Sequence, residues 1–129
     1  MTHKAPRKSV FIEDFIHMGA DGLHPLEPVG ATGDCDLREI KRLYGKDICL
    51  VGNVQYEDFA RSSPEEMDRC VRDTMVAAKA GGGFILSPAC PFYHRLLPAQ
   101  IVRSIEAFID AGHRHGAYGG ESGKGKEEP

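Results

Sequence analysis

Ile48-Cys49-Leu50-Val51-Gly52-Asn53 is the stretch of sequence that decides the fold. Its first four residues form a continuous apolar run, which is typical of a strand that is buried on both faces in a parallel sheet. The glycine and asparagine that follow predict the end of this strand, because both residues favour turns. We therefore expect a central parallel strand near residues 47–52.

Two further strands are predicted, one on either side of this stretch in the sequence. The first lies near residues 22–26 and ends at Pro25 and Pro28, since proline cannot continue a hydrogen-bonded ladder. The other lies near residues 83–87, where an apolar run follows the glycines at 81–83. The sequence thus predicts three strands of similar character.

Helices are predicted before, between and after these strands. A short amphipathic helix covers residues 9–18, and a second begins at Asp36, where Glu39 completes a capping box. A third begins at Ser63, with proline at its first position and Glu66 as the partner of the cap. The apolar residues of that helix, which we expect to be buried, are Met67, Cys70, Val71, Met75 and Ala78.

The last helix is predicted to begin at Pro98, a residue that is common at the first position of a helix. Its apolar face is expected to consist of Ile101, Ile105, Phe108 and Ile109. Helices thus alternate with strands, and this order predicts an α/β fold of parallel strands joined by right-handed crossovers. A sheet of only three such strands leaves two unpaired edges, so we expect self-association or a partner chain to complete it.

Length and composition fit one domain over residues 1–118, followed by a disordered tail over 119–129 that is rich in glycine and charge. The chain has 129 residues and a net charge of -3, without the basic excess of a nucleic-acid binder. No apolar run is long enough to span a membrane, and the first residues lack the apolar stretch of a signal peptide. We therefore expect a cytoplasmic protein with free thiols.

Reactive groups of parallel α/β folds gather beyond the carboxyl ends of the strands, where loops vary above a rigid core. Glu27, Asn53 and Cys90 follow the three predicted strands in turn. We expect these three side chains to converge on one face as candidate catalytic residues. Each also has a structural interpretation: a solvated carboxylate, an amide that caps a turn, and a cysteine that acts as a small apolar side chain.

Four motifs in order resemble the C-terminal portion of the uroporphyrinogen decarboxylase superfamily, over roughly residues 11–116. They are Gly19-Ala20-Asp21-Gly22-Leu23-His24-Pro25-Leu26-Glu27-Pro28, Asp36-Leu37-Arg38-Glu39-Ile40-Lys41, Leu50-Val51-Gly52-Asn53-Val54 and Gly82-Gly83-Phe84-Ile85-Leu86-Ser87-Pro88. The resemblance implies part of a TIM-type (β/α)8 barrel of about eight strands. The superfamily contains decarboxylases of porphyrin biosynthesis and zinc-dependent methyltransferases that use corrinoids.

Cys90 stands at what looks like the position where the decarboxylases carry a histidine, and this favours the methyltransferase branch. The resemblance then implies zinc ligation by Cys90 and Glu27, with His3 at the position of an early histidine ligand and Ala5 where that branch has a cysteine. The implied chemistry is methyl transfer from a corrinoid, supplied by a partner protein, to a zinc-bound thiolate.

A porphyrin decarboxylase and a non-catalytic remnant or subunit are the alternatives to this hypothesis. With Ala5 in place of a thiolate ligand, we expect this fragment to be metal-free or only partly occupied by zinc, and inactive alone.

Overall fold

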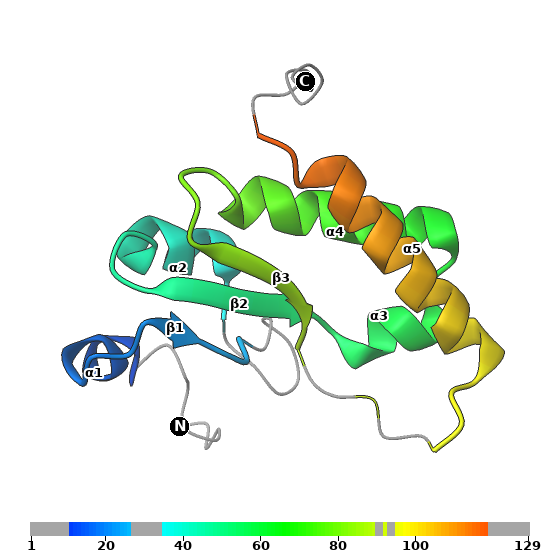
Figure 1. The fold of residues 1–129 in the computed structure, drawn as a ribbon, viewed down its shortest axis with the longest axis horizontal. Helices are drawn as coiled ribbons and strands as arrows, with labels where there is room; N and C mark the ends of the chain where they lie inside the picture. Colours follow the sequence, from blue (N-terminus) through cyan, green and yellow to red (C-terminus); the bar gives the residue numbers. More distant parts are fainter. Residues whose placement is uncertain (1–10, 27–34, 90–91, 93–94, 119–129) are drawn as a thin grey trace, which may run out of the picture.

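The computed structural model describes residues 11–26, 35–89, 92 and 95–118 (Figure 1). Within these ranges helices and strands alternate through most of the chain. In order along the chain, the elements are α1 (Ile12–His17), β1 (Gly22–Leu23), α2 (Leu37–Tyr44), β2 (Cys49–Val54), α3 (Tyr56–Arg61), α4 (Pro64–Ala78), β3 (Phe84–Pro88) and α5 (Ala99–His115).

The strands form a three-stranded parallel sheet in the order β1-β2-β3. The predicted α/β fold and the parallel pairing are therefore confirmed. Leu50 of β2 is the centre of the register, because it pairs with Leu23 of β1 on one side and with Phe84 of β3 on the other. The side chain of Leu50 is fully buried.

The predicted carboxyl ends of the first two strands need correction, while the third strand lies within one residue of its predicted range. β1 contains two residues instead of the predicted five, and Pro25, which lacks a backbone N–H, follows soon after its end. β2 continues past its predicted end, because Asn53 and Val54 pair with Ser87 and Pro88 of β3. Partner residues on the neighbouring strand thus override the local preference of Gly-Asn for a turn.

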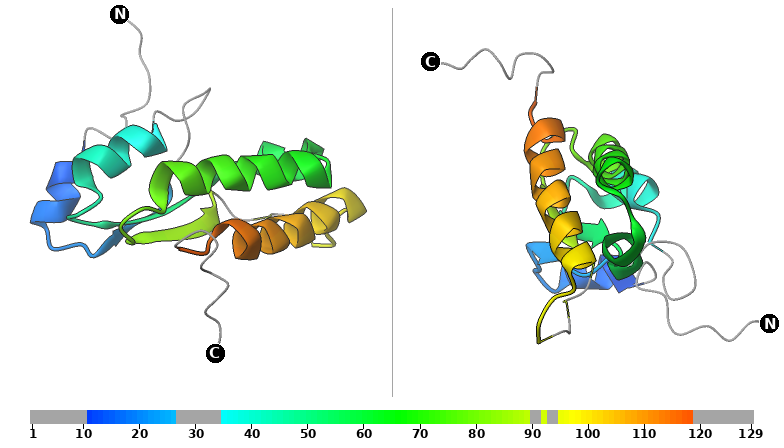
Figure 2. Two further views of the ribbon diagram at one scale, coloured as in Figure 1. Left: turned by 90° about the horizontal axis from the view of Figure 1, so that it is seen from above. Right: turned by 90° about the vertical axis from the view of Figure 1, so that its right-hand side faces the viewer.

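Helices pack against one face of the sheet. Leu50 joins Leu37 and Ile40 of α2 and Ala78 of α4 in one core cluster. In a second cluster Val54 packs with residues of α3, α4 and α5, namely Phe59, Met67, Val71, Met75 and Ala111. The views of Figure 2 show α2 and α4 together on the same side of the strands.

The opposite face of β2 and β3 is uncovered in the described part of the chain. In Figure 1 this face is turned towards the viewer, and no helix crosses in front of it. Ile85 of β3, which alternates with the inward-facing Phe84 and Leu86, is 55% exposed. The sheet therefore has one face packed by helices and one on which Ile85 is exposed.

The helix starts follow the sequence signals closely. At α4 the Ser63 hydroxyl accepts a hydrogen bond from the Glu66 N–H at 3.1 Å, and the Glu66 carboxylate accepts one from the Ser63 N–H at 2.8 Å. At α2 the Asp36 carboxylate accepts from the Arg38 N–H at 3.1 Å. The Glu39 side chain pairs with Arg42 instead of returning to the cap, so the predicted box at α2 is only half formed.

Helix α3 was not predicted, and its six residues carry too short an apolar pattern to reveal it. Its Phe59 is nevertheless fully buried, with its ring 5.0 Å from that of Phe92 and 5.1 Å from that of Phe108. An aromatic cluster therefore fixes a helix whose local sequence alone would not.

The predicted buried face of α5 is wrong at Ile109, which is 51% exposed. Ser104 is buried in its place, because the Gln100 amide donates to the Ser104 hydroxyl oxygen at 3.0 Å and to the Ser62 carbonyl at 2.7 Å. This polar contact ties α5 to the junction of α3 and α4 and sets the rotation of the helix. Cys70 on α4 is likewise only partly buried.

The predicted disordered tail at 119–129 lies outside the described residues. Within the described ranges, none of the helices has both the length and the apolar character that a membrane span requires.

Ser63→Ala should lower the free energy of unfolding by about 1 kcal/mol, because the Glu66 N–H would lose the hydroxyl oxygen that caps it. The measurement is urea unfolding followed by circular dichroism at one fixed protein concentration. Ser62→Ala is the matched control, since the contact of Ser62 with Gln100 uses the backbone carbonyl. Equal losses of stability in the two variants would contradict the assigned role of the capping box.

Candidate functional site

A polar side chain that follows β1 and another near the end of β3 meet at the carboxyl end of the sheet. The Nε2 atom of His24, just after β1, lies 3.1 Å from the Pro88 carbonyl oxygen and 3.4 Å from the Ser87 hydroxyl oxygen. Ser87 also donates to the Pro88 carbonyl at 2.8 Å. Because β2 lies between β1 and β3, this contact reaches across the central strand.

His24 and Ser87 were not among the predicted site residues. His24 directly follows the residues of β1, and Ser87 lies one residue before the end of β3. Both therefore satisfy the strand-end rule that selected the predicted residues. The prediction missed His24 because the strand was expected to run to residue 26, which placed this histidine inside it.

Of the predicted catalytic residues, only Asn53 lies in the described part of the chain. It sits within β2, opposite Ser87 in the register, and is 8% exposed. Glu27 and Cys90, and the doubtful metal ligand His3, lie outside the described residues. Their predicted convergence with Asn53 stays a prediction.

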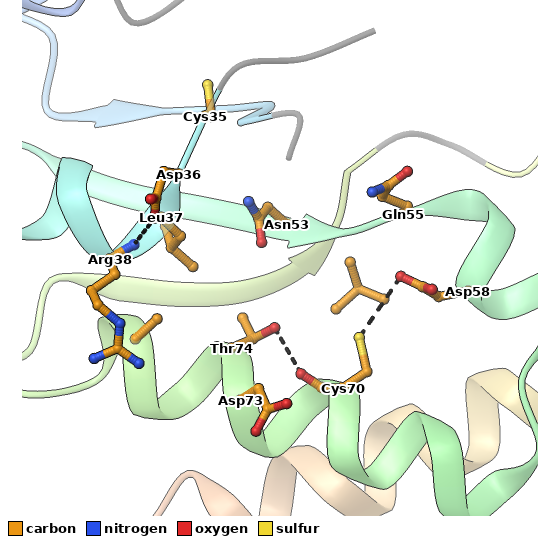
Figure 3. Close-up of a pocket in the computed structure, with 12 residues that line it drawn as sticks. Cys35, Asp36, Leu37, Arg38, Asn53, Gln55, Asp58, Cys70, Asp73 and Thr74 are labelled. Carbon is orange, nitrogen blue, oxygen red and sulfur yellow. Dashed lines mark hydrogen bonds between the residues drawn. The ribbon is translucent and has the colours of Figure 1, made fainter. Parts of the chain in front are cut away.

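Asn53 also lines a cavity of about 680 Å³ between the start of α2, the end of β2, α3 and α4 (Figure 3). Polar and charged residues outnumber the others in its lining, although apolar atoms supply more of the lining surface. They are Cys35, Asp36, Leu37, Arg38, Asn53, Val54, Gln55, Asp58, Cys70, Asp73, Thr74 and Ala77. The cavity is wide open to solvent, and its volume is within the range of roughly 300–1,000 Å³ that small-molecule sites occupy.

Cys70 and Asp58 face each other across one end of this cavity (Figure 3). The Cys70 thiol lies 3.8 Å from the Asp58 carboxylate, to which it donates. Burial raises the pKa of the Cys70 thiol to about 12, with the charge and hydrogen bond of Asp58 and the charge of Asp73 as further causes. At neutral pH this sulfur is a protonated donor and not a nucleophile.

The described residues do not supply a zinc site. Among them, no group of three or more His, Cys, Asp or Glu side chains is arranged so that it could hold a metal ion. Cys35 and Cys70 both line the cavity, but they belong to no such group in the described part of the chain. The site therefore offers hydrogen bonds and negative charge instead of metal ligation.

Comparison with known proteins identifies no family for this chain. No family model matches it, and no curated protein gives a significant match.

Cys70 should react with iodoacetamide at pH 8 more slowly in the folded chain than in the unfolded chain, because a pKa near 12 leaves little thiolate at that pH. Asp58→Asn should speed the reaction, since it removes a negative charge that raises the pKa. Peptide mass spectrometry at successive times measures the rate at Cys70.

Glu57→Gln is the matched control for that variant, because it makes the same charge change one residue earlier in α3, at a position that does not line the cavity. A Cys70 rate that is unchanged by Asp58→Asn would show that the carboxylate does not act on this thiol.

Proposed function

We propose that the chain is the C-terminal part of a (β/α)8 barrel enzyme of the uroporphyrinogen decarboxylase-like superfamily, and that it is catalytically incomplete alone. The function of the complete enzyme that we favour is methyl transfer between a corrinoid and a thiol. The observation that carries the proposal is the winding of the sheet, in which sequence-ordered parallel strands have their helices on one face.

This winding is the one that a barrel requires, and one half of a doubly wound sheet shares it. In a doubly wound sheet the strand order reverses at one point, and helices then cover both faces. In a barrel each crossover repeats the same right-handed step, so the strands follow in sequence order and all helices lie outside. The order β1-β2-β3 and the uncovered face of β2 and β3 agree with the second pattern.

The position of the polar groups supports the same proposal. Barrel enzymes carry their catalytic groups at the carboxyl ends of the strands, and His24 and Ser87 meet at that end. The branch within the superfamily rests on Cys90 in the resemblance alone. Zinc ligation by Glu27, Cys90 and His3 is part of the proposal, although the described residues offer no metal site of their own.

The chain by itself should associate with further copies or with a partner chain, because Ile85 is exposed on the uncovered face and the described residues leave the sheet edges open. Ile85→Lys should weaken this association, since it places a charge at the 55% exposed side chain of that face. Light scattering coupled to size-exclusion chromatography measures the mass. A complete enzyme that buries Ile85 inside its barrel would be destabilised by the same substitution.

Leu43→Lys is the matched control, because Leu43 of α2 is exposed to a similar extent, at 49%, but is carried by a helix instead of the sheet. Its mass should equal that of the unchanged chain. A stable, compact monomer of the unchanged chain would contradict the proposed barrel fragment.

Zinc content should be well below one ion per chain after dialysis, and transfer of a methyl group from methylcobalamin to a thiol should not be measurable. The physical reason is that Ala5 stands where the methyltransferase branch has a thiolate ligand, so Glu27, Cys90 and His3 do not make up the full ligand set of that branch. Elemental analysis of the chain and of Cys90→Ser tests this. Near-stoichiometric zinc that disappears on Cys90→Ser would show that the fragment builds a complete site.

A further inference from the structure

The buried side-chain amide of Asn53 has no hydrogen-bond partner among the residues that the structure describes. Only 8% of the residue is exposed, and it lines the cavity between α2 and α4. A carboxamide has two N–H donors and an acceptor oxygen, and buried groups of this kind in native proteins nearly always find partners. The unmet hydrogen bonds of Asn53 therefore point to a molecule that enters the cavity.

The groups around Asn53 restrict what this molecule is. Thr74 already donates its hydroxyl proton to the Cys70 carbonyl at 2.9 Å, so its oxygen is left to accept. The Asp58 carboxylate accepts a hydrogen bond from the Cys70 thiol and has further lone pairs that can accept others. Figure 3 shows Asn53 on the strand and Thr74 and Cys70 on the facing helix α4. Apart from the side-chain amide N–H groups, these side chains mostly accept hydrogen bonds. They therefore suit a ligand that donates hydrogen bonds.

The charged residues that line the cavity also favour a ligand that donates hydrogen bonds. Three aspartates line the cavity, at positions 36, 58 and 73, against one arginine, Arg38. The Arg38 side chain is exposed, and Figure 3 shows its guanidinium turned away from Asn53. The charges of Asp58 and Asp73 both raise the pKa of the Cys70 thiol, in addition to burial, so their fields overlap at the cavity wall.

We propose that this cavity binds a small organic cation, whose ammonium or guanidinium group lies near Asp58 and whose hydrogen-bonding groups meet the Asn53 amide. Its volume of about 680 Å³ accommodates such a molecule. The proposal concerns the chain alone and does not depend on methyl transfer or on a completed barrel. Its failure would leave the proposed function untouched.

The probe is agmatine, which carries both an ammonium and a guanidinium group, titrated into the 15N-labelled full chain. We expect saturable shifts of the Asn53 side-chain amide signals and of the backbone signals of Asp58 and Thr74. Butyramide and butyrate, which are neutral and anionic, should bind more weakly or not at all. The titration is run at about 0.15 M salt, where loose attraction between exposed charges is largely screened.

Three substitutions then test the assigned contacts. Asn53→Leu keeps the size of the side chain and removes its hydrogen bonds, and it should weaken agmatine binding about tenfold. Asp58→Asn lies on a helix at the cavity wall and should weaken it about threefold. Glu57→Gln, the matched charge change outside the cavity, should leave the affinity unchanged.

Two results would overturn the proposal. One is the lack of any saturable shift at Asn53, Asp58 and Thr74 in the folded chain. The other is an equal loss of affinity in Asp58→Asn and Glu57→Gln, which would reveal general attraction to a negative surface. Asp58→Asn keeps the test valid if Asn53→Leu does not fold, which circular dichroism establishes beforehand.

Discussion

The pairing of β2 on both of its edges is the constraint on which the rest of the described structure depends. Cys49 donates to the Asp21 carbonyl at 2.9 Å on one side, and Leu50 donates to the Gly83 carbonyl at 2.9 Å on the other. These bonds fix the register of β1 and β3 relative to one strand. They thereby bring His24 and Ser87, which are 63 residues apart in the sequence, to the same end of the sheet.

The same strand organises the core. Leu50 and Val54 belong to two separate clusters, one with α2 and one with α3, α4 and α5. Because both side chains face the helices, the apolar burial that stabilises the fold is concentrated on one side of the sheet. The other side, with Ile85, gains nothing from these contacts. An α/β sheet that is packed on one face only is the physical reason to expect a further covering layer.

Local chemistry with a defined spacing was predictable from the sequence. The capping box of α4 needs only Ser63 and Glu66 at the right distance, and the structure forms it as expected. The apolar run around Leu50 likewise identified the central strand, although helices pack only against the face of Leu50 and Val54 in the described part of the chain.

Features that depend on distant partners were not predictable in this way. β2 extends through Asn53 because β3 supplies Ser87 opposite it, and no pattern near residue 53 encodes that pairing. Ile109 is exposed because the Gln100 amide holds α5 to the carbonyl of Ser62, the C-cap residue of α3, which lies 38 residues away in the sequence. The candidate site shows the same division. Asn53 was selected by the strand-end rule, but its position in a cavity beside Asp58 and Cys70 arises from the packing of α3 and α4 against β2.

At Asn53 the stability of the fold and the proposed ligand binding favour different side chains. A buried amide without partners costs roughly 1–3 kcal/mol relative to one that is paired, while an apolar side chain of similar size would not carry this cost. The neighbouring Val54 shows that the same end of β2 can support an apolar residue in the core. Packing among the described residues therefore gives no reason for a carboxamide at position 53. Sites that bind ligands commonly violate the rules of packing in this manner, because the unmet hydrogen bonds become favourable only when the ligand is present.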